Sequence, residues 1–244
     1  MENILNITQK PQIDESIERY EYHSYEPITV TDLNRPGEIG SNVETQDLFT
    51  HQSECYLIFY GKSLKNADDA AYANADIIML SNNAMMHLFN KIKYQLSGLE
   101  IESLFHPGQA TTMLGLLKIP DDFQKSTGLK QLWFKDSSTD ASFAGNNQNN
   151  GFRSRHGYII QKPDPKGTFS FRVPLKHIFG FCDDYEKVVY GFKHQLTLIR
   201  KGDNDAIFRA AAADAGKVVL SKLSWYMPHV TSNLQKKTCT LQNN

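Results

Sequence analysis

Eight histidines are the residues of this sequence that could most readily hold a metal ion. They are His23, His51, His87, His106, His156, His177, His194 and His229. None is spaced as HxH or HExxH, the patterns that bring two imidazoles to one ion. His177 and Cys182 stand five residues apart and could join a metal site only through remote partners. We therefore predict no metal site. We expect His194, on the face of Leu196 and Leu198, to be a hydrogen-bonded core residue.

The other candidates for catalysis or phosphate binding have simpler interpretations. Cys55 lies in an apolar run, where a thiol is too inaccessible to act as a nucleophile. Gly61-Lys62-Ser63 ends like a phosphate-binding loop, but the glycine required five positions earlier is Tyr56. The acidic pairs Asp121-Asp122 and Asp183-Asp184 fit a helix start and a solvated turn. No GxSxG elbow occurs, so we predict no catalytic residues, no cofactor and no enzymatic activity.

Composition excludes several classes of protein. With 40% hydrophobic and 11% aromatic residues among 244, the chain can build a substantial core. Its 26 basic and 27 acidic residues leave no positive excess for nucleic acid. The longest apolar runs, 56–60 and 77–80, are far shorter than the roughly 20 residues that span a bilayer. The N-terminus has no secretory signal and the three cysteines are widely spaced, so we expect an intracellular protein with free thiols.

The elements that would position these residues are mostly strands. Apolar and polar residues alternate through 91–96 and again through 99–104, around the turn dipeptide Ser97-Gly98. This pattern predicts a hairpin with all its apolar partners on one face. The expected register pairs Leu96 with Leu99, Tyr94 with Ile101, and Lys93 with Glu102.

Further strands and a few short helices complete the prediction. A second hairpin is expected from Tyr158 and Ile160, through a turn at 163–167, to the alternating residues Phe169, Phe171 and Val173. The other expected strands are 39–45, 55–60, 188–200 and 217–227. The expected helices place Ala110, Met113, Leu114 and Leu117 on one apolar face, continue from 121 towards 133, and place Leu175, Ile178 and Phe179 on one side. Residues 136–151 are expected to form an exposed loop.

This inventory predicts an all-β fold, an antiparallel jelly-roll sandwich with a few short inserted helices. Residues 1–20 are polar and weakly patterned, so we expect a mobile N-terminal arm. The jelly-roll domain is expected over 21–230. Residues 231–244 are expected to form a polar C-terminal tail.

Five stretches carry a resemblance to a known family. They are 22–27 (YHSYEP), 108–115 (GQATTMLG), 173–181 (VPLKHIFGF), 185–191 (YEKVVYG) and 224–230 (SWYMPHV). Together they resemble the double jelly-roll proteins found in animal genomes, which are similar to major capsid proteins of Polinton/Maverick elements and virophages. The resemblance covers roughly residues 22–230 and corresponds to the first jelly roll only.

The resemblance implies a structural role without catalysis. The family forms capsomers from homotrimers with two jelly rolls in each chain, and a functional member belongs to a virion. We therefore expect this chain to be a capsomer subunit, or a truncated relic of one, that associates with itself and lacks the second jelly roll. The alternative is a jelly-roll binding module that holds a carbohydrate or protein ligand on its loops.

Aromatic clusters suggest where subunits would meet. Aromatic residues are enriched at the centres of protein interfaces. The interface candidates are Phe179, Phe181, Tyr185, Trp225, Tyr226 and Met227. A jelly roll without its sister should leave an apolar face uncovered, and we expect Trp225, Tyr226 and Met227 to line it. Self-association of the isolated chain would follow.

Overall fold

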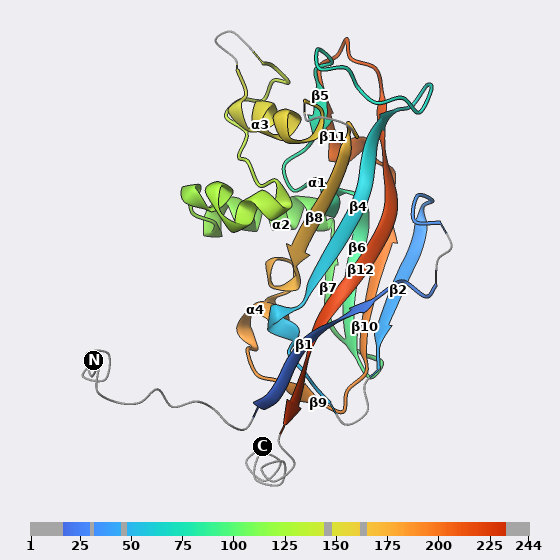
Figure 1. The fold of residues 1–244 in the computed structure, drawn as a ribbon, viewed down its shortest axis with the longest axis vertical. Coiled ribbons are helices and arrows are strands. Elements are labelled where there is room, and N and C mark those ends of the chain that lie inside the picture. The colour runs from blue at the N-terminus through green and yellow to red at the C-terminus, as the bar shows by residue number, and fades with distance from the viewer. Residues whose placement is uncertain (1–16, 30–31, 45–47, 144–147, 162–164, 233–244) are drawn as a thin grey trace, which may run out of the picture.

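Two antiparallel sheets face each other in the computed structural model, which describes residues 17–29, 32–44, 48–143, 148–161 and 165–232 (Figure 1). The first sheet contains, in spatial order, β8 (Thr168–Pro174), β4 (Tyr56–Lys65), β12 (Gly216–Ser232), β3 (Phe49–Thr50) and β9 (Val189–Tyr190), and β1 (Ile17–Tyr25) also pairs with β12. The second contains β2 (Gly37–Val43), β10 (His194–Arg200), β6 (Phe89–Leu96) and β7 (Leu99–Phe105). A small third sheet pairs β5 (Ile78–Leu80) with β11 (Ile207–Arg209).

The long strands alternate between the two main sheets as the chain proceeds. β1 lies in the first sheet, β2 in the second and β4 in the first. The β6–β7 hairpin lies in the second sheet. β8 then lies in the first sheet, β10 in the second and β12 in the first. This wrapping is the topology of a jelly roll, so the predicted fold class is confirmed. The side chains between the sheets form one apolar core, which includes Phe59, Ile92, Leu198 and Trp225.

The β6–β7 hairpin forms with one irregularity that was not predicted. Ser97 and Gly98 both have positive φ, 47° and 85°, and Leu96 pairs with Leu99 as expected. A bulge then shifts the register, so that Tyr94 lies opposite Glu102 and Lys93 opposite Ser103. The expected pairs of Tyr94 with Ile101 and Lys93 with Glu102 are therefore wrong.

The bulge has a tertiary reason, because it places Glu102 beside the short helix α4 (Gly180–Asp184). The Glu102 carboxylate accepts hydrogen bonds from the backbone N–H groups of Gly180 (3.0 Å) and Phe181 (2.9 Å). These two donors at the start of α4 need acceptors. A local pattern of alternation could not reveal this partner.

Strand β1 extends the domain beyond its expected boundary. It begins at Ile17 and pairs with β12 so that Tyr20 lies opposite Val230 and Tyr25 opposite Trp225. Residues 17–20, expected in the arm, therefore belong to the sheet. The rest of the expected arm (1–16) and most of the expected tail (233–244) lie outside the described residues.

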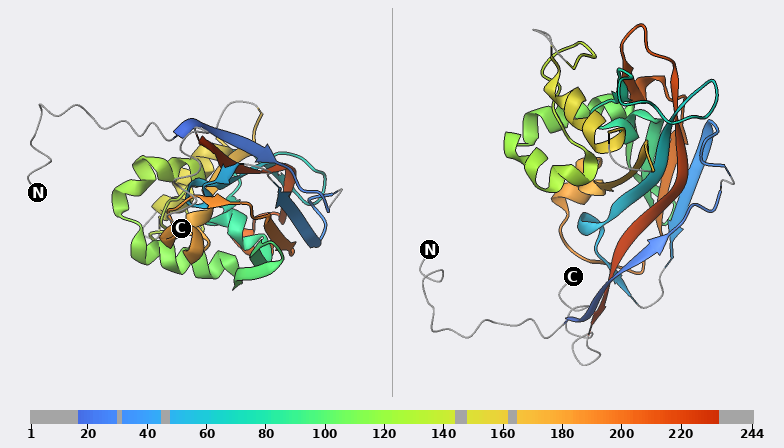
Figure 2. Two further views of the ribbon diagram at one scale, coloured as in Figure 1. Left: turned by 90° about the horizontal axis from the view of Figure 1, so that it is seen from below. Right: turned by 45° about the horizontal axis from the view of Figure 1, so that its top comes forward.

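Most of the helical structure lies between β7 and β8. It comprises α2 (Pro107–Lys118), η3 (Asp121–Lys125), η4 (Thr127–Gln131) and α3 (Asn150–Ile159), which we call the helical insert. Figure 2 shows it gathered on one side of the sandwich. The remaining helical turns are η2 (Gln52–Glu54), α1 (Ala84–His87), η5 (Leu175–His177), α4 and η6 (Asn204–Ala206). Within the described ranges, no helix is both long and apolar enough to cross a bilayer.

Helix α3 replaces the strand expected at Tyr158 and Ile160. Asn149 caps it by accepting a hydrogen bond from the N–H of Phe152 (3.1 Å). The buried side chains Phe152, His156 and Ile159 follow helical spacing. Buried beside them, Arg155 donates to the carbonyl oxygen of Leu80 (2.9 Å). Polar Arg and His on the buried face disguised the period, so the second hairpin is wrong in its first strand and right in β8.

Candidate functional site

Helix α2 packs against the body through small residues. Gly108 lies against the ring of His87, and Gly115 lies so close to the Trp133 ring that a Cβ there would clash. Between them the hydroxyl of Thr111 donates to the carbonyl oxygen of Pro107 (2.6 Å). The same hydroxyl accepts from Nδ2 of Asn83 (2.6 Å). These small side chains let the helix backbone approach the body closely.

The large apolar side chains of α2 are consequently left largely exposed. Met113, Leu114, Leu116 and Leu117 are 66%, 56%, 48% and 86% exposed, and we call them the α2 apolar face. The apolar face predicted for Met113, Leu114 and Leu117 therefore forms, and it is exposed instead of buried. Isolated exposed apolar residues are ordinary, but four on one short helix indicate a contact surface.

A second unusual surface lies on the outer side of the first sheet. The guanidinium of Arg172 (β8) lies 3.6 Å from the ring centroid of Tyr56 (β4). Tyr56 stacks on Tyr226 of β12, with centroids 5.0 Å apart and planes 11° apart. Tyr22 of β1 extends the row, 5.4 Å from Tyr56, and Tyr20 follows at 6.0 Å. We call these five residues the tyrosine row; burial is the main cause of the raised pKa of Tyr56.

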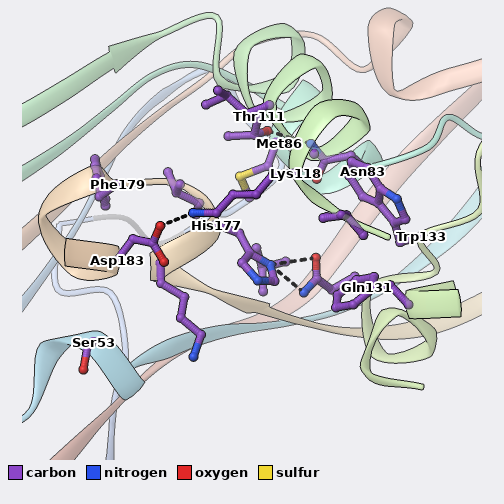
Figure 3. A pocket seen from close by; sticks show the side chains of 18 of the residues that line it. Ser53, Asn83, Met86, Thr111, Lys118, Gln131, Trp133, His177, Phe179 and Asp183 are labelled. Carbon is purple, nitrogen blue, oxygen red and sulfur yellow. Dashed lines mark hydrogen bonds and ion pairs between the residues drawn. The ribbon is translucent and has the colours of Figure 1, made fainter. Parts of the chain in front are cut away.

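A cavity of about 620 Å³ lies between α2 and the body (Figure 3). Its walls come from α1, α2, α4, the turns η2, η3, η4 and η5, and the end of β8. Apolar wall residues include Met86, Ile119, Phe123, Ile178 and Phe179. Leu114 also lines it, so the cavity adjoins the α2 apolar face and reaches the surface.

His177 contributes a polar group to this cavity. Nδ1 of His177 lies 3.0 Å from Nε2 of Gln131, and its ring meets Phe123 edge-on at 6.0 Å. Burial, reinforced by the charge of Lys176, lowers the pKa of His177, so the ring is neutral near pH 7. Nδ1 also lies 3.5 Å from Oε1 of Gln131, and we assign the shorter contact as the amide N–H donating to Nδ1, which places the His177 proton on Nε2. That Nε2–H has no hydrogen-bond partner in the described part of the chain.

The charged side chains at the cavity are largely paired with one another. Lys118 of α2 forms an ion pair with Asp183 of α4, and Figure 3 shows this contact. The hydrogen bond that Lys118 donates to the Asp183 carboxylate is the main cause of the raised pKa of Lys118. Lys176 pairs with Glu54 at 3.2 Å. These contacts neutralise both lysines of the cavity wall.

The interface candidates fall into two groups. Trp225 and Met227 are 0% exposed and Phe179 is 1% exposed, so all three belong to the core. They cannot line an uncovered apolar face, because β12 directs residues 225 and 227 inward and residue 226 outward. Tyr226 lies in the tyrosine row. Phe181 stacks on the exposed Tyr185, with centroids 5.5 Å apart.

His194 is a hydrogen-bonded core residue, as the sequence predicts. His194 is completely buried, with Nδ1 2.6 Å from the hydroxyl of Tyr94 and Nε2 2.7 Å from that of Thr50. These bonds join β10 to β6 and β3, across the two sheets. Burial, with a smaller contribution from His229, lowers the pKa of His194 to about 4.

Comparison with models of protein families identifies the family of this chain. The model of the double jelly roll-like domain matches residues 78–243, more than half of the chain. The chain belongs to the double jelly roll-like family. A comparison with curated proteins by sequence finds no match.

Solved structures show the same fold in viral proteins. A chain in the cryo-EM structure of the Sputnik virophage superposes with a TM-score of 0.67 at 12% identity, covering 94% of this chain and 51% of that one. The Faustovirus major capsid protein gives 0.50 at 12% identity, covering 93% and 57%. Similarity at this identity shows the fold alone. This double jelly roll-like chain spans about half the length of the viral chains it matches.

Proposed function

We propose that this chain is a non-catalytic, capsid-type structural subunit that associates with further copies of itself through the α2 apolar face. The observation that carries the proposal is the exposure of four large apolar side chains on a helix of a capsid-like jelly roll. Burying one such side chain is worth about 1.5–3 kcal/mol, so covering the face would favour association. The finer parts of the proposal are a homotrimeric capsomer, a virion location and an origin in a Polinton/Maverick-type element.

The tyrosine row supports a second contact in such an assembly. Tyrosine and arginine are enriched where interfaces contribute most of their energy. The row is built across β1, β12, β4 and β8, so its side chains are held on a rigid sheet. Ion pairs at its margin, Arg19 with Glu21 and Lys222 with Glu26, balance positive and negative charge. A balanced margin allows a second copy to approach without net repulsion.

The experiment is sedimentation velocity of the purified chain over a range of concentrations. We expect the wild type to associate and the double variant Met113→Lys/Leu117→Lys to remain monomeric. The matched control is Gln109→Lys/Thr139→Lys, which adds the same charge at exposed polar positions and should associate like the wild type. A wild type that stays monomeric at high concentration, or a control that dissociates equally, would overturn the role of this face.

A further inference from the structure

We propose that the cavity beneath α2 binds a small uncharged molecule with an apolar body and one hydrogen-bond acceptor. This inference goes beyond assembly and does not depend on it, because the cavity is built within a single chain. Its walls join the helical insert to the sandwich, so an occupant would contact both parts.

The size and lining of the cavity match a ligand site. Protein interiors leave few voids larger than a water molecule, whereas sites for small molecules measure roughly 300–1,000 Å³. At about 620 Å³ this cavity falls within that range. Water against the part of the wall formed by Met86, Phe123 and Ile178 would find few hydrogen-bond partners, although polar side chains line the rest. An apolar body is the occupant that such walls favour.

His177 supplies the group that would orient the ligand. Gln131 and Phe123 hold its ring, and its Nε2–H remains without a partner among the described residues. An N–H at the wall of an apolar cavity gains from an acceptor oxygen, such as a carbonyl or ether. This group therefore selects a molecule that carries an acceptor.

The charges around the cavity select against an ionic ligand. Lys118 and Lys176 already hold Asp183 and Glu54, so an anion would find no free lysine. Glu186 is the lining carboxylate for which the described residues provide no ion pair, but it is exposed at the rim. A cation that descended to His177 would exchange water for apolar walls and an N–H donor, at a large cost. An uncharged ligand avoids both penalties.

Entry to the cavity does not require α2 to move, because the cavity already reaches the surface. The Lys118–Asp183 pair joins α2 to α4 beside the cavity, and the Lys118 side chain is well exposed. Exposed ion pairs typically contribute only about 0–1 kcal/mol. The pair is therefore only a weak barrier at the edge of the cavity.

The probe for this site is Nile red, an uncharged aromatic dye with a carbonyl acceptor and a fluorescence that rises in apolar surroundings. We expect saturable binding of one dye per chain. Ile178→Trp fills the cavity, and His177→Phe removes the donor while keeping a ring; each should weaken binding at least tenfold. Met113→Lys/Leu117→Lys is the control, because neither residue lines the cavity, and it should bind like the wild type.

A second measurement tests occupancy without relying on the folding of Ile178→Trp. The chain has two tryptophans, and the Nε1–H of Trp133, in the cavity wall, is buried without a partner among the described residues. Nile red should shift the indole N–H signal of Trp133 in a ¹⁵N spectrum and leave that of Trp225 unchanged; Trp133→Phe assigns the signals. Non-saturable binding, loss of binding in the surface control alone, or an unmoved Trp133 signal would overturn the site.

Discussion

The sandwich and the helical insert bury their residues in opposite ways. In the sandwich, large side chains such as Trp225 face inward and both nitrogens of the buried His194 are hydrogen-bonded. In the insert, α2 turns small residues inward and exposes Leu117, and across the cavity His177 of η5 has one ring nitrogen without a hydrogen-bond partner among the described residues. The sandwich is therefore packed for stability, whereas the helical insert leaves an apolar face exposed and a cavity beside it.

The largest expected effect comes from truncating one apolar side chain in each region. Trp225→Ala should lower the free energy of unfolding by about 3–5 kcal/mol, because it leaves a large void between packed sheets. Leu117→Ala should change it by less than about 0.5 kcal/mol, because the side chain is 86% exposed. Urea denaturation of both variants, below the concentration at which the chain associates, measures the contrast. Similar losses at both positions would break it.

Acid should act on the sandwich through His194. The unfolded chain binds this proton near pH 6.5 and the folded chain near pH 4, so the unfolded state holds more protons between these values. Stability is therefore complete above about pH 6.5 and falls by about 3 kcal/mol on acidification to pH 4. His229, whose pKa burial also lowers to about 4, acts in the same direction.

Thermal melting between pH 7 and pH 4 tests this dependence. His194→Gln should flatten the fall in melting temperature, because the substituted residue takes up no proton. His106→Asn is the control: His106 is exposed and has a φ of 48°, a conformation that asparagine tolerates. An unchanged slope in His194→Gln would show that other groups govern the acid response.

A smaller effect sharpens the comparison within the helical insert. Gly115→Ala should destabilise the chain by about 1–3 kcal/mol, because the added methyl overlaps the Trp133 ring. Gly157→Ala in α3 should stabilise it by up to about 1 kcal/mol, since its Cβ would meet only Oε1 of Gln161, at 3.8 Å. Chemical denaturation of the two variants should therefore give changes of opposite sign. Equal changes would mean that the approach of α2 to Trp133 is not tight.

Sequence patterns predicted the strands of the sandwich better than the details that depend on distant residues. Alternation located β6, β7 and β8 because one face of each strand packs on the core. It could not anticipate the bulge at Glu102, which depends on a partner 78 residues away in the chain. The jelly-roll class was therefore predictable, whereas details fixed by distant partners were not.

The candidate site was hidden for a related reason. Helical spacing correctly grouped Met113, Leu114 and Leu117, but which side of α2 meets the body depends on the close fit of Gly115 to Trp133. Nothing in the sequence indicates the cavity, because its walls come from separate segments and the spacing of His177 from Cys182 suggests only a metal ligand with remote partners. Among the interface candidates, strict alternation along β12 was the signal that would have separated Tyr226 from Trp225 and Met227.

The pairing of β1 with β12 also determines how the domain would respond to mechanical force. Ile17 lies opposite Ser232, and the two strands run antiparallel from that point to Tyr25 and Trp225. Tension applied at residues 17 and 232 would pull on one end of the β1–β12 pair. The hydrogen bonds between the two strands would then break one at a time, starting from that end. The domain should therefore yield at low force when pulled at these two positions, and resist far more when pulled along its strands.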